Sequence, residues 1–460
     1  MTDHDVDPRI ASWLRHEAPP MANPALTDAI LGATRGTRQH GAWLGRRPWL
    51  SRAVLAAGTV AGVLLVGAIL AGWWRSPPPI GPSPSPEAST SAAASASAAP
   101  SAEVVESPEF DNPVWGSVTI PNADPAGSGG AWPHDVVVGG RGLVAVGSAS
   151  PCCADAGYDD EPWSAVIWTS PDGRRWELLP DLDTFGKAGL RAVAANDDGL
   201  MVAAGYEVLP PDPSEPEHLF QMEARLWRST NGIDWIGVAA PDGEIRDIEW
   251  SPLGWVAVGA VGDDAAVSIS SDLETWTTEL FDPGAFDHVA VDANGVIVAG
   301  GCLGDQASAP DGCGFRVATT TDARTWAEAE LDGSVTAIVG MLEGGFTAVG
   351  EADGRAVSWG SPDGVAWDGD SFPDSAPDGF TAAAVGESGV IAAEAASDGT
   401  GGPRVWHSFD GRSWTLIAEL EPIPGQRDTA VRTLAFRDAQ YIVLGNGFRD
   451  GGEPSAWHGS

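Results

Sequence analysis

The sequence predicts an all-β fold in residues 109–460, a seven-bladed β-propeller closed by N- and C-terminal strands that share one blade. Three observations predict it. A short apolar strand phrase that ends in Gly recurs along this region, a turn phrase that ends in Trp recurs after it, and one turn phrase lies at the opposite end of the region from its strand. Ahead of this region the sequence predicts a short α-helical leader, one transmembrane helix and a disordered linker.

The leader, residues 1–52, contains two amphipathic patterns, at residues 8–18 and 22–39, that indicate short helices. Their place before a membrane segment resembles the cytoplasmic leader of single-pass anti-sigma-type regulators. The zinc-binding His/Cys motif of those regulators is missing, because no Cys precedes Cys152. A simple membrane-proximal leader and an anti-sigma-like regulator are therefore the two interpretations of this segment.

A membrane span is predicted at residues 53–74, a run of 22 residues without a charge. At about 1.5 Å per residue, a helix of this length crosses the ~30 Å hydrocarbon core. Most of the flanking arginines precede the span, so the positive-inside rule places the N-terminus in the cytoplasm and the region after the span outside. The arginines are Arg46, Arg47 and Arg52 before the span and Arg75 after it. A cleaved signal peptide fits less well, because a long segment precedes the apolar run.

Residues 75–108 are rich in Pro, Ser and Ala, a composition that stays extended and solvated, so we expect a disordered stalk. The chain carries a net charge of −39, and its acidic excess lies in residues 109–460. Such a surface repels phosphate groups, which argues against nucleic acid as a partner. A protein or glycan ligand at the extracytoplasmic face is the expected partner.

The turn phrase has six clear copies, each with a hydroxyl residue, Asp or Asn two positions on, and Trp four positions beyond that. The copies are SPDGRRW (170–176), STNGIDW (229–235), SSDLETW (270–276), TTDARTW (320–326), SPDGVAW (361–367) and SFDGRSW (408–414). The strand phrase has seven copies, from GLVAVG (142–147) to QYIVLG (440–445). The seventh strand therefore needs a turn phrase from elsewhere in the chain.

That seventh turn phrase is predicted at the start of the region. The chain ends at SAWHGS (455–460), where the next turn should begin, and EFDNPVW (109–115) supplies Asp111 and Trp115 in register with the other copies. Each unit is then about 50 residues long, enough for a four-stranded antiparallel sheet. A blade shared by the two ends of a chain closes a ring, whereas a solenoid keeps open ends.

The turn phrase, Ser-x-Asp-Gly-x-x-Trp, resembles the Asp-box of the bacterial neuraminidase repeat, which is found in sialidases and sortilin-type receptors. The resemblance covers all seven units and implies that the box is a structural hairpin turn between the third and fourth strands, away from the site at the propeller axis. The Asp accepts backbone N–H groups, Gly or Asn supplies a positive φ, and Trp packs beneath the turn. The structural residues are Asp111, Trp115, Asp172, Trp176, Asn231, Trp235, Asp272, Trp276, Asp322, Trp326, Asp363, Trp367, Asp410 and Trp414.

The resemblance also sets what a sialidase would need: three axial arginines, a Tyr nucleophile with a Glu beside it, and an acid Asp. The stretch VTIPN places Thr119 where the family has an arginine. The three tyrosines are Tyr158, Tyr206 and Tyr441, and Tyr206 would point away from its neighbour Glu207 in a strand. A sialidase is therefore disfavoured. Another glycosidase needs only two carboxylates, which the sequence cannot select.

No cofactor or metal is expected. The acidic clusters at residues 159–162, 196–199 and 262–265 lack the alternating ligand spacing of a calcium loop, so they are interpreted as solvated turns. No Gly-rich phosphate loop, zinc pattern or Ser-nucleophile elbow occurs in the sequence.

The cysteines all follow the membrane span, on the side where thiols oxidise. Cys302 and Cys313 flank an insertion between the second and third strands of the fourth blade, and we predict a disulfide between them. Cys152 and Cys153 lie in the corresponding loop of the first blade. Because they are adjacent, they pair only as a strained ring, so free thiols and an intermolecular bridge stay open.

The function predicted from these observations is a membrane-anchored extracytoplasmic binding or scaffolding module, which is favoured over an enzyme. A glycan-active hydrolase is the alternative, and an axial Arg cluster or a carboxylate pair would favour it. The anti-sigma-like regulator is the third interpretation, and it rests on residues 1–52.

Overall fold

The structure is a computed structural model that describes eleven stretches of one compact unit, Val104–Ser460. They are residues 113–122, 130–150, 164–180, 182–209, 221–303, 314–371, 379–394, 402–422, 429–437, 440–447 and 454–459. The predicted leader (1–52), membrane span (53–74) and stalk (75–108), and Asp111 of the first turn phrase, lie outside the described residues. No helix within the described stretches is long and apolar enough to cross a membrane.

The described residues form an all-β structure, as predicted, with one short 3-10 turn, η1 (Asp183–Phe185). All sheets are antiparallel, and every sheet except the one that contains β1 (Trp115–Thr119) is built from consecutive strands. The first holds β2 (Gly130–Gly139), β3 (Gly142–Ser150), β4 (Ser164–Ser170) and β5 (Glu177–Leu178). The second holds β6 (Ala188–Ala195), β7 (Met201–Leu209), β8 (Gln221–Ser229) and β9 (Ile236–Val238). The third begins with β10 (Glu244–Ser251), β11 (Gly254–Val261) and β12 (Asp264–Ser270).

One long strand, β13 (Thr277–Val291), joins the third unit to the fourth. Its first part pairs with β12 and its second part with β14 (Ile297–Leu303), so the two units form one seven-stranded sheet. The repeat in the sequence predicts a separate sheet for each unit. The difference arises because the backbone stays extended from the outer strand of one unit into the inner strand of the next. The fourth unit continues with β15 (Gly314–Thr320) and β16 (Ala327–Leu331).

Three further sheets complete the described structure. One contains β17 (Ser334–Gly340), β18 (Phe346–Ala352), β19 (Arg355–Ser361) and β20 (Asp368–Ser371). The next contains β21 (Phe380–Gly386), β22 (Gly389–Glu394), β23 (Arg404–Ser408) and β24 (Thr415–Glu419). The last has the order β1-β27-β26-β25, from β1 (Trp115–Thr119), β27 (Pro454–Gly459), β26 (Gln440–Gly447) and β25 (Thr429–Arg437).

The last sheet brings the two ends of the region together. β1 pairs with β27 antiparallel, with Trp115 opposite Gly459. The Trp115 ring stacks on Tyr441 of β26, with 6.4 Å between ring centroids. The N-terminal strand is therefore the outer strand of a sheet whose other three strands come from the C-terminal end of the chain.

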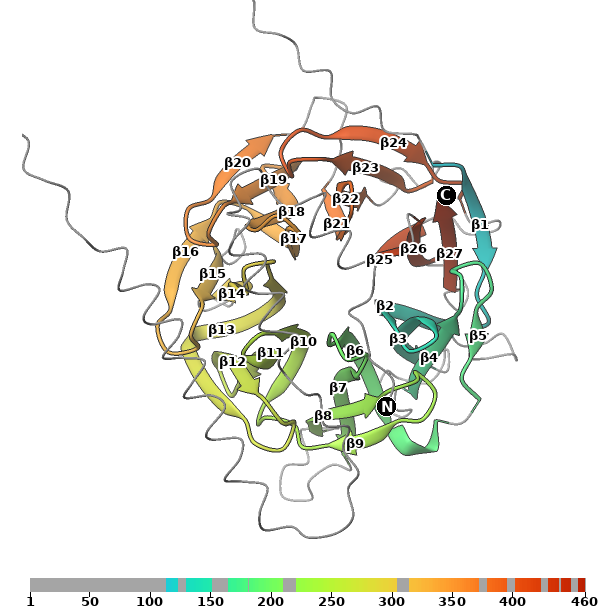
Figure 1. Ribbon diagram of the computed structural model, residues 1–460, viewed down its shortest axis with the longest axis horizontal. Helices are drawn as coiled ribbons and strands as arrows, with labels where there is room; N and C mark the ends of the chain where they lie inside the picture. The colour runs from blue at the N-terminus through green and yellow to red at the C-terminus, as the bar shows by residue number, and fades with distance from the viewer. Residues whose placement is uncertain are drawn as a thin grey trace, which may run out of the picture. The chain divides into compact units, whose positions relative to one another are not determined.

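The sheets are arranged around a common axis as in a β-propeller, with one strand of each unit innermost (Figure 1). The inner strands are in contact in the order β2, β6, β10, β13, β17, β21 and β25, and β25 is in contact with β2. The strand that follows each of them is buried on both faces. In β3, Leu143 packs in a cluster with Ile442 of one neighbour, and Val144 packs with Met201 of the other. This explains why the strand phrases are apolar at nearly every position.

The turn phrases form tight turns between the third and fourth strands of the units. Asp172 Oδ1 accepts the N–H groups of Arg174 and Arg175 at 2.9 and 3.1 Å, and Ser170 Oγ accepts that of Gly173 at 2.9 Å. The same two N–H bonds are made to Asn231, Asp272, Asp322, Asp363 and Asp410. These bonds favour the ionised carboxylate, and at Asp322 they lower the pKa to about 2.

The residue after the Asp has a left-handed backbone. Gly173 has φ +72, and a Cβ there would lie 2.8 Å from Ile442 Cγ1. Two turns lack the glycine and still adopt this conformation, with φ 60 at Leu273 and φ 57 at Ala323. The indole N–H of Trp276, in the first of these turns, donates to Ala239 O rather than to its own turn. The indole N–H of Trp414 also donates outside its own turn, to Ser358 Oγ at 3.0 Å, although that turn keeps Gly411, so the contacts of the Trp vary among turns with and without the glycine.

Cys302 lies at the end of β14 and is disulfide-bonded. Its partner lies outside the described residues, as do Cys152, Cys153 and Cys313. The strands on either side of the insertion are paired, with Leu303 opposite Gly314. The pairing of Cys302 with Cys313 stays a prediction.

Candidate binding site in the axial cavity

The inner strands surround a cavity of about 550 Å³ at the axis. Its volume lies within the range of about 300–1,000 Å³ that is usual for small-molecule sites. Every one of the seven inner strands contributes lining residues. The lining of this cavity is therefore shared by all units of the ring.

A β-bulge in each inner strand aims one side chain into the cavity. The ladder between the first and second strand of each unit shifts register at one residue, which leaves that residue unpaired and re-aims its side chain. The seven residues line the cavity and are, around the ring, Arg432, His134, Arg191, Arg246, Asp287, Thr336 and Thr381. We call them the bulge ring.

The bulge ring is electrostatically uneven. Arg191, Arg246 and Arg432 belong to one run of neighbouring inner strands, with only His134 among them. Although the His134 side chain is exposed to the cavity, desolvation by the surrounding protein, together with the charges of Arg432 and Arg191, lowers its pKa to about 4. The imidazole is therefore neutral at physiological pH, and the positive charge of this side comes from the guanidinium groups.

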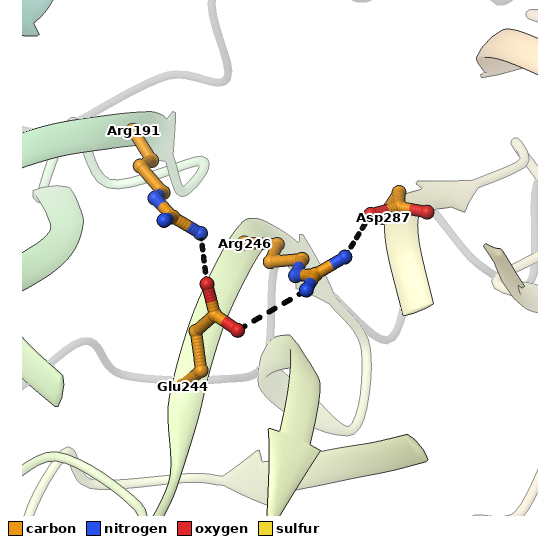
Figure 2. Close-up of polar contacts among 4 residues, drawn as sticks. All are labelled: Arg191, Glu244, Arg246 and Asp287. Carbon is orange, nitrogen blue, oxygen red and sulfur yellow. Dashed lines mark hydrogen bonds and ion pairs between the residues drawn. The ribbon is translucent and has the colours of Figure 1, made fainter. Parts of the chain in front are cut away.

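Two of the arginines belong to a chain of ion pairs (Figure 2). Glu244 binds Arg191 with one carboxylate oxygen, and its other oxygen lies 3.2 Å from Arg246. Arg246 also binds Asp287 Oδ1 at 2.6 Å. Desolvation opposes ionisation of Glu244, but the two guanidinium groups outweigh it and lower the pKa of this carboxyl. The third arginine, Arg432, donates from Nε to Asn446 Oδ1 at 2.9 Å.

Two carboxyl groups beside the bulge ring hold neighbouring inner strands together. Asp135 accepts the N–H of Val193, on the next inner strand, at 2.8 Å, and Asp247 accepts that of Val289 at 2.9 Å. Both side chains are only half-buried, yet the protein around them still desolvates them. This desolvation raises the pKa of Asp135 to about 6 and that of Asp247 well above its usual value.

A third carboxyl group lines the cavity near them. Glu249 Oε1 accepts the N–H of Trp250 at 2.9 Å. Desolvation, aided by the charge of Asp135, outweighs the hydrogen bond from Trp250 and raises the pKa of Glu249 to about 7. At neutral pH this group is divided between its acid and its carboxylate form, so it is able to donate or accept a proton.

The tyrosine and glutamate of the sialidase pattern do not meet. The Tyr206 ring lies against the guanidinium of Arg191, at 5.2 Å from the ring centroid, while Glu207 binds Arg225 at 2.9 Å. Tyr441 contacts Ser388 through its hydroxyl at 3.0 Å and packs in the core. Tyr158 lies outside the described residues. Among the residues that the structure describes, no Tyr–Glu hydrogen bond is formed.

The axial arginines are not predicted from the sequence, because the sialidase pattern points to residue 119. Thr119 belongs to β1, the outer strand of its sheet. The signal was nonetheless present, because each axial arginine follows an apolar residue in the run that precedes a strand phrase. These runs are GLRAV (189–193), EIRDI (244–248) and AVRTL (430–434). The described residues of the turn phrases do not line the cavity.

The described residues contain no group of three or more His, Cys, Asp or Glu side chains arranged to hold a metal ion. In the acidic cluster at 196–199, Asn196 Oδ1 accepts the N–H groups of Asp198 and Leu200, which is a local turn. The cluster at 159–162 lies outside the described residues.

No family model matches the chain, and no curated protein matches it. Solved structures do show similarity. A protein of unknown function from Dyadobacter fermentans is 15% identical, with 74% of this chain and 97% of that chain covered and a TM-score of 0.49. An α-L-arabinofuranosidase from Fusarium graminearum is 13% identical, with 76% and 98% covered and a TM-score of 0.40. A Trypanosoma rangeli sialidase is 12% identical, with 75% and 58% covered and a TM-score of 0.41. At these values no activity is transferred to this chain.

Proposed function

We propose that the chain is a membrane-anchored, extracytoplasmic binding module whose axial cavity takes an anionic ligand. The observation that carries the proposal is the position of Arg191, Arg246 and Arg432 in one side of the bulge ring. The anchor at residues 53–74 and the extracytoplasmic location rest on the apolar run and the flanking arginines.

We propose further that the described region is a seven-bladed propeller. The closed order of inner-strand contacts supports this reading, with β13 divided between two blades. The sheet formed by β1 and β25–β27 is then the shared blade, which supports the predicted closure by the two ends of the region. Such a closed ring brings the seven bulge residues to one cavity.

The chemistry of the arginine side suits a carboxylate or another planar anion. A guanidinium group presents parallel N–H donors that match two oxygens of such a group. In a chain with 64 acidic and only 25 basic residues, three arginines that line one cavity are a strong local departure from the surrounding charge. The acidic exterior repels anions at a distance, so selectivity arises from contacts inside the cavity and not from long-range attraction.

Isothermal titration of the detergent-solubilised full chain tests this function. The probes are glucuronate and N-acetylneuraminate, with glucose and N-acetylglucosamine as neutral counterparts. We expect binding of at least one anionic probe, and a loss of tenfold or more in Arg432→Gln. Arg225→Gln is the matched control. Arg225 of β8 forms an ion pair with Glu207 of β7, and it does not line the cavity. Equal binding of neutral probes, or unchanged binding by Arg432→Gln, would contradict the proposal.

A glycan-active hydrolase is the second candidate, and two observations favour it. The axial arginine cluster is present, and Glu249 in the same cavity has a pKa of about 7, which suits a general acid. Against it, Asp135 and Asp247 are engaged by backbone N–H groups. Release of the aglycone from nitrophenyl glycosides of the acidic sugars, abolished in Glu249→Gln, would establish the enzyme. The anti-sigma-like role of residues 1–52 stays a prediction.

A further inference from the structure

A second cavity, of about 450 Å³, lies between the third and fourth units and shares no residue with the axial cavity. Its apolar wall is formed by Leu253, Val267 and Ile269, with the ring of Trp326 facing them from the fourth unit. Hydroxyl and charged side chains complete the lining. They are Ser270, Ser271, Thr275, Thr277, Glu279, Asp322 and Arg324.

The aromatic wall of this cavity is held differently from the equivalent residues of three other units. Trp176, Trp235 and Trp367 each donate their indole N–H to the carbonyl of the glycine in their own turn, at 3.0, 3.1 and 2.9 Å. Ala323 replaces that glycine in the fourth unit, and the N–H of Trp326 is buried without an acceptor. The ring instead packs edge-on against Phe281, with 5.3 Å between centroids. Trp326 is thus a half-buried cavity wall that its own turn does not fix.

The charged groups of the cavity also lack the contacts made at equivalent positions. Arg174 and Arg412 occupy the place of Arg324 in other turns, and they reach His458 Nε2 at 3.2 Å and Asp368 Oδ2 at 3.3 Å. Among the described residues, Arg324 and Glu279 make no ion pair and no side-chain hydrogen bond. A guanidinium donor and a carboxylate acceptor therefore line the same cavity, and both are available to a ligand.

From this arrangement we propose that the cavity between the third and fourth units binds a neutral saccharide, as a site separate from the axial cavity. A pyranose ring has an apolar C–H face, which packs on an aromatic ring, and an edge of hydroxyl groups that both donate and accept hydrogen bonds. Trp326 and the aliphatic wall provide the surface for the face. Arg324, Glu279 and Thr277 provide the donor, the acceptor and a hydroxyl for the edge.

A zwitterionic peptide end is the competing ligand class. It matches the opposite charges of Glu279 and Arg324, but it makes no use of the apolar wall or of the Trp326 ring. The volume also exceeds what two charged groups alone would fill, and it is within the usual range of small-molecule sites. The observations therefore favour the saccharide.

Saturation-transfer difference NMR on the detergent-solubilised full chain tests the proposal. The probes are glucose, galactose, N-acetylglucosamine, maltose and cellobiose, with glycylglycine as the zwitterion. We expect saturation transfer to the ring protons of at least one sugar, reduced fivefold or more in both Arg324→Ala and Glu279→Gln. These side chains lie at the cavity edge and make no contact that the fold needs, so their loss leaves the protein folded. Trp326→Phe should weaken the signal and keep the core filled.

Two controls separate this site from the axial one. Arg412→Ala changes the equivalent turn position in another unit, and Arg432→Gln changes the axial cavity; both should keep the sugar signal. The proposal is overturned if no sugar gives a signal, if the signal survives Arg324→Ala and Glu279→Gln, or if glycylglycine alone binds. Loss of the signal in Arg432→Gln would place the sugar at the axis and would also overturn it. If glucuronate and N-acetylneuraminate do not bind in the axial cavity, the proposal of this separate saccharide site still stands.

Discussion

Asp247 Oδ2 accepts the backbone N–H of Val289 at 2.9 Å, which joins β10 to β13, the next inner strand of the ring. Asp135 makes the same contact from β2 to β6, and the Thr336 hydroxyl donates to Phe380 O at 2.6 Å, from β17 to β21. Among the described residues, the two strands of each of these pairs share no hydrogen-bonded ladder. Side chains beside and within the bulges therefore form hydrogen bonds that link neighbouring inner strands around the axis.

Removing such a side chain should destabilise the ring. In Asp247→Ala the buried N–H of Val289 loses its acceptor, and we expect a loss of about 1–3 kcal/mol in the free energy of unfolding. Asp247→Asn keeps an amide oxygen at the same place and should cost less. Chemical denaturation measures both, with the exposed Asp198→Ala as control. Equal stability of Asp247→Ala and the wild type would show that the contact adds nothing.

The raised pKa of Glu249 predicts a pH dependence. The pKa rises from 4.5 to about 7 on folding, so the folded state binds this proton more tightly than the unfolded state. The stability that it contributes is present below pH 4.5 and is lost as the pH rises to about 7. Glu249→Gln removes this titration. The melting temperature of the variant minus that of the wild type should therefore increase as the pH rises from 5 to 8.

The exposed Glu274→Gln provides the comparison for this measurement. It should follow the wild-type melting temperature across the same range, since Glu274 lies in a solvated turn. A constant difference between Glu249→Gln and the wild type from pH 5 to pH 8 would mean that cavity water solvates the ionised group fully.

The turns without glycine give a third prediction. Ala323 adopts φ 57, a conformation that costs an L-residue roughly 1–2 kcal/mol, and Ala323→Gly relieves this strain. Glycine also gives the unfolded chain more conformational entropy, which destabilises the folded state and offsets the relief. The net effect of Ala323→Gly should be below about 1 kcal/mol. Gly364→Ala introduces the same strain and a Cβ that would lie 2.6 Å from Val298 Cγ2. We expect it to cost at least about 2 kcal/mol. Similar unfolding midpoints for the two variants would contradict this reading.

The strands and turns were predictable because each leaves a local pattern. An apolar run covered on both faces, such as residues 142–147, and the turn at 170–176 show their structure in their own composition. The bulge ring leaves almost none. A bulge is one unpaired residue in a ladder, and Arg191, Thr336 and Asp287 have no side-chain chemistry in common. Their shared role follows only from ring closure, which brings distant inner strands to one axis.

Closure of the ring by β1 gives a fourth prediction. Deletion of residues 109–120 removes the outer strand of the shared sheet and the Trp115 ring that stacks on Tyr441. Loss of a packed aromatic ring alone costs about 3–5 kcal/mol, so a large fall in melting temperature is expected. Deletion of residues 76–105 should leave the melting temperature unchanged. Calorimetry on both deletions is decisive, and equal stability would argue against closure by the N-terminal strand.

The last prediction concerns the partner of Cys302, which is disulfide-bonded at the end of β14. β14 and β15 are paired up to Leu303 and Gly314, and Cys313 directly precedes Gly314 in the sequence, so we expect Cys313 to be the partner. Closing a loop of this size stabilises a fold by roughly 3 kcal/mol, less any strain. Replacement of both cysteines by serine should lower the melting temperature modestly and leave the ring folded. Non-reducing peptide mapping should find Cys302 joined to Cys313. A peptide that joins Cys302 to Cys152 or Cys153 would show instead that the insertions of the first and fourth units meet.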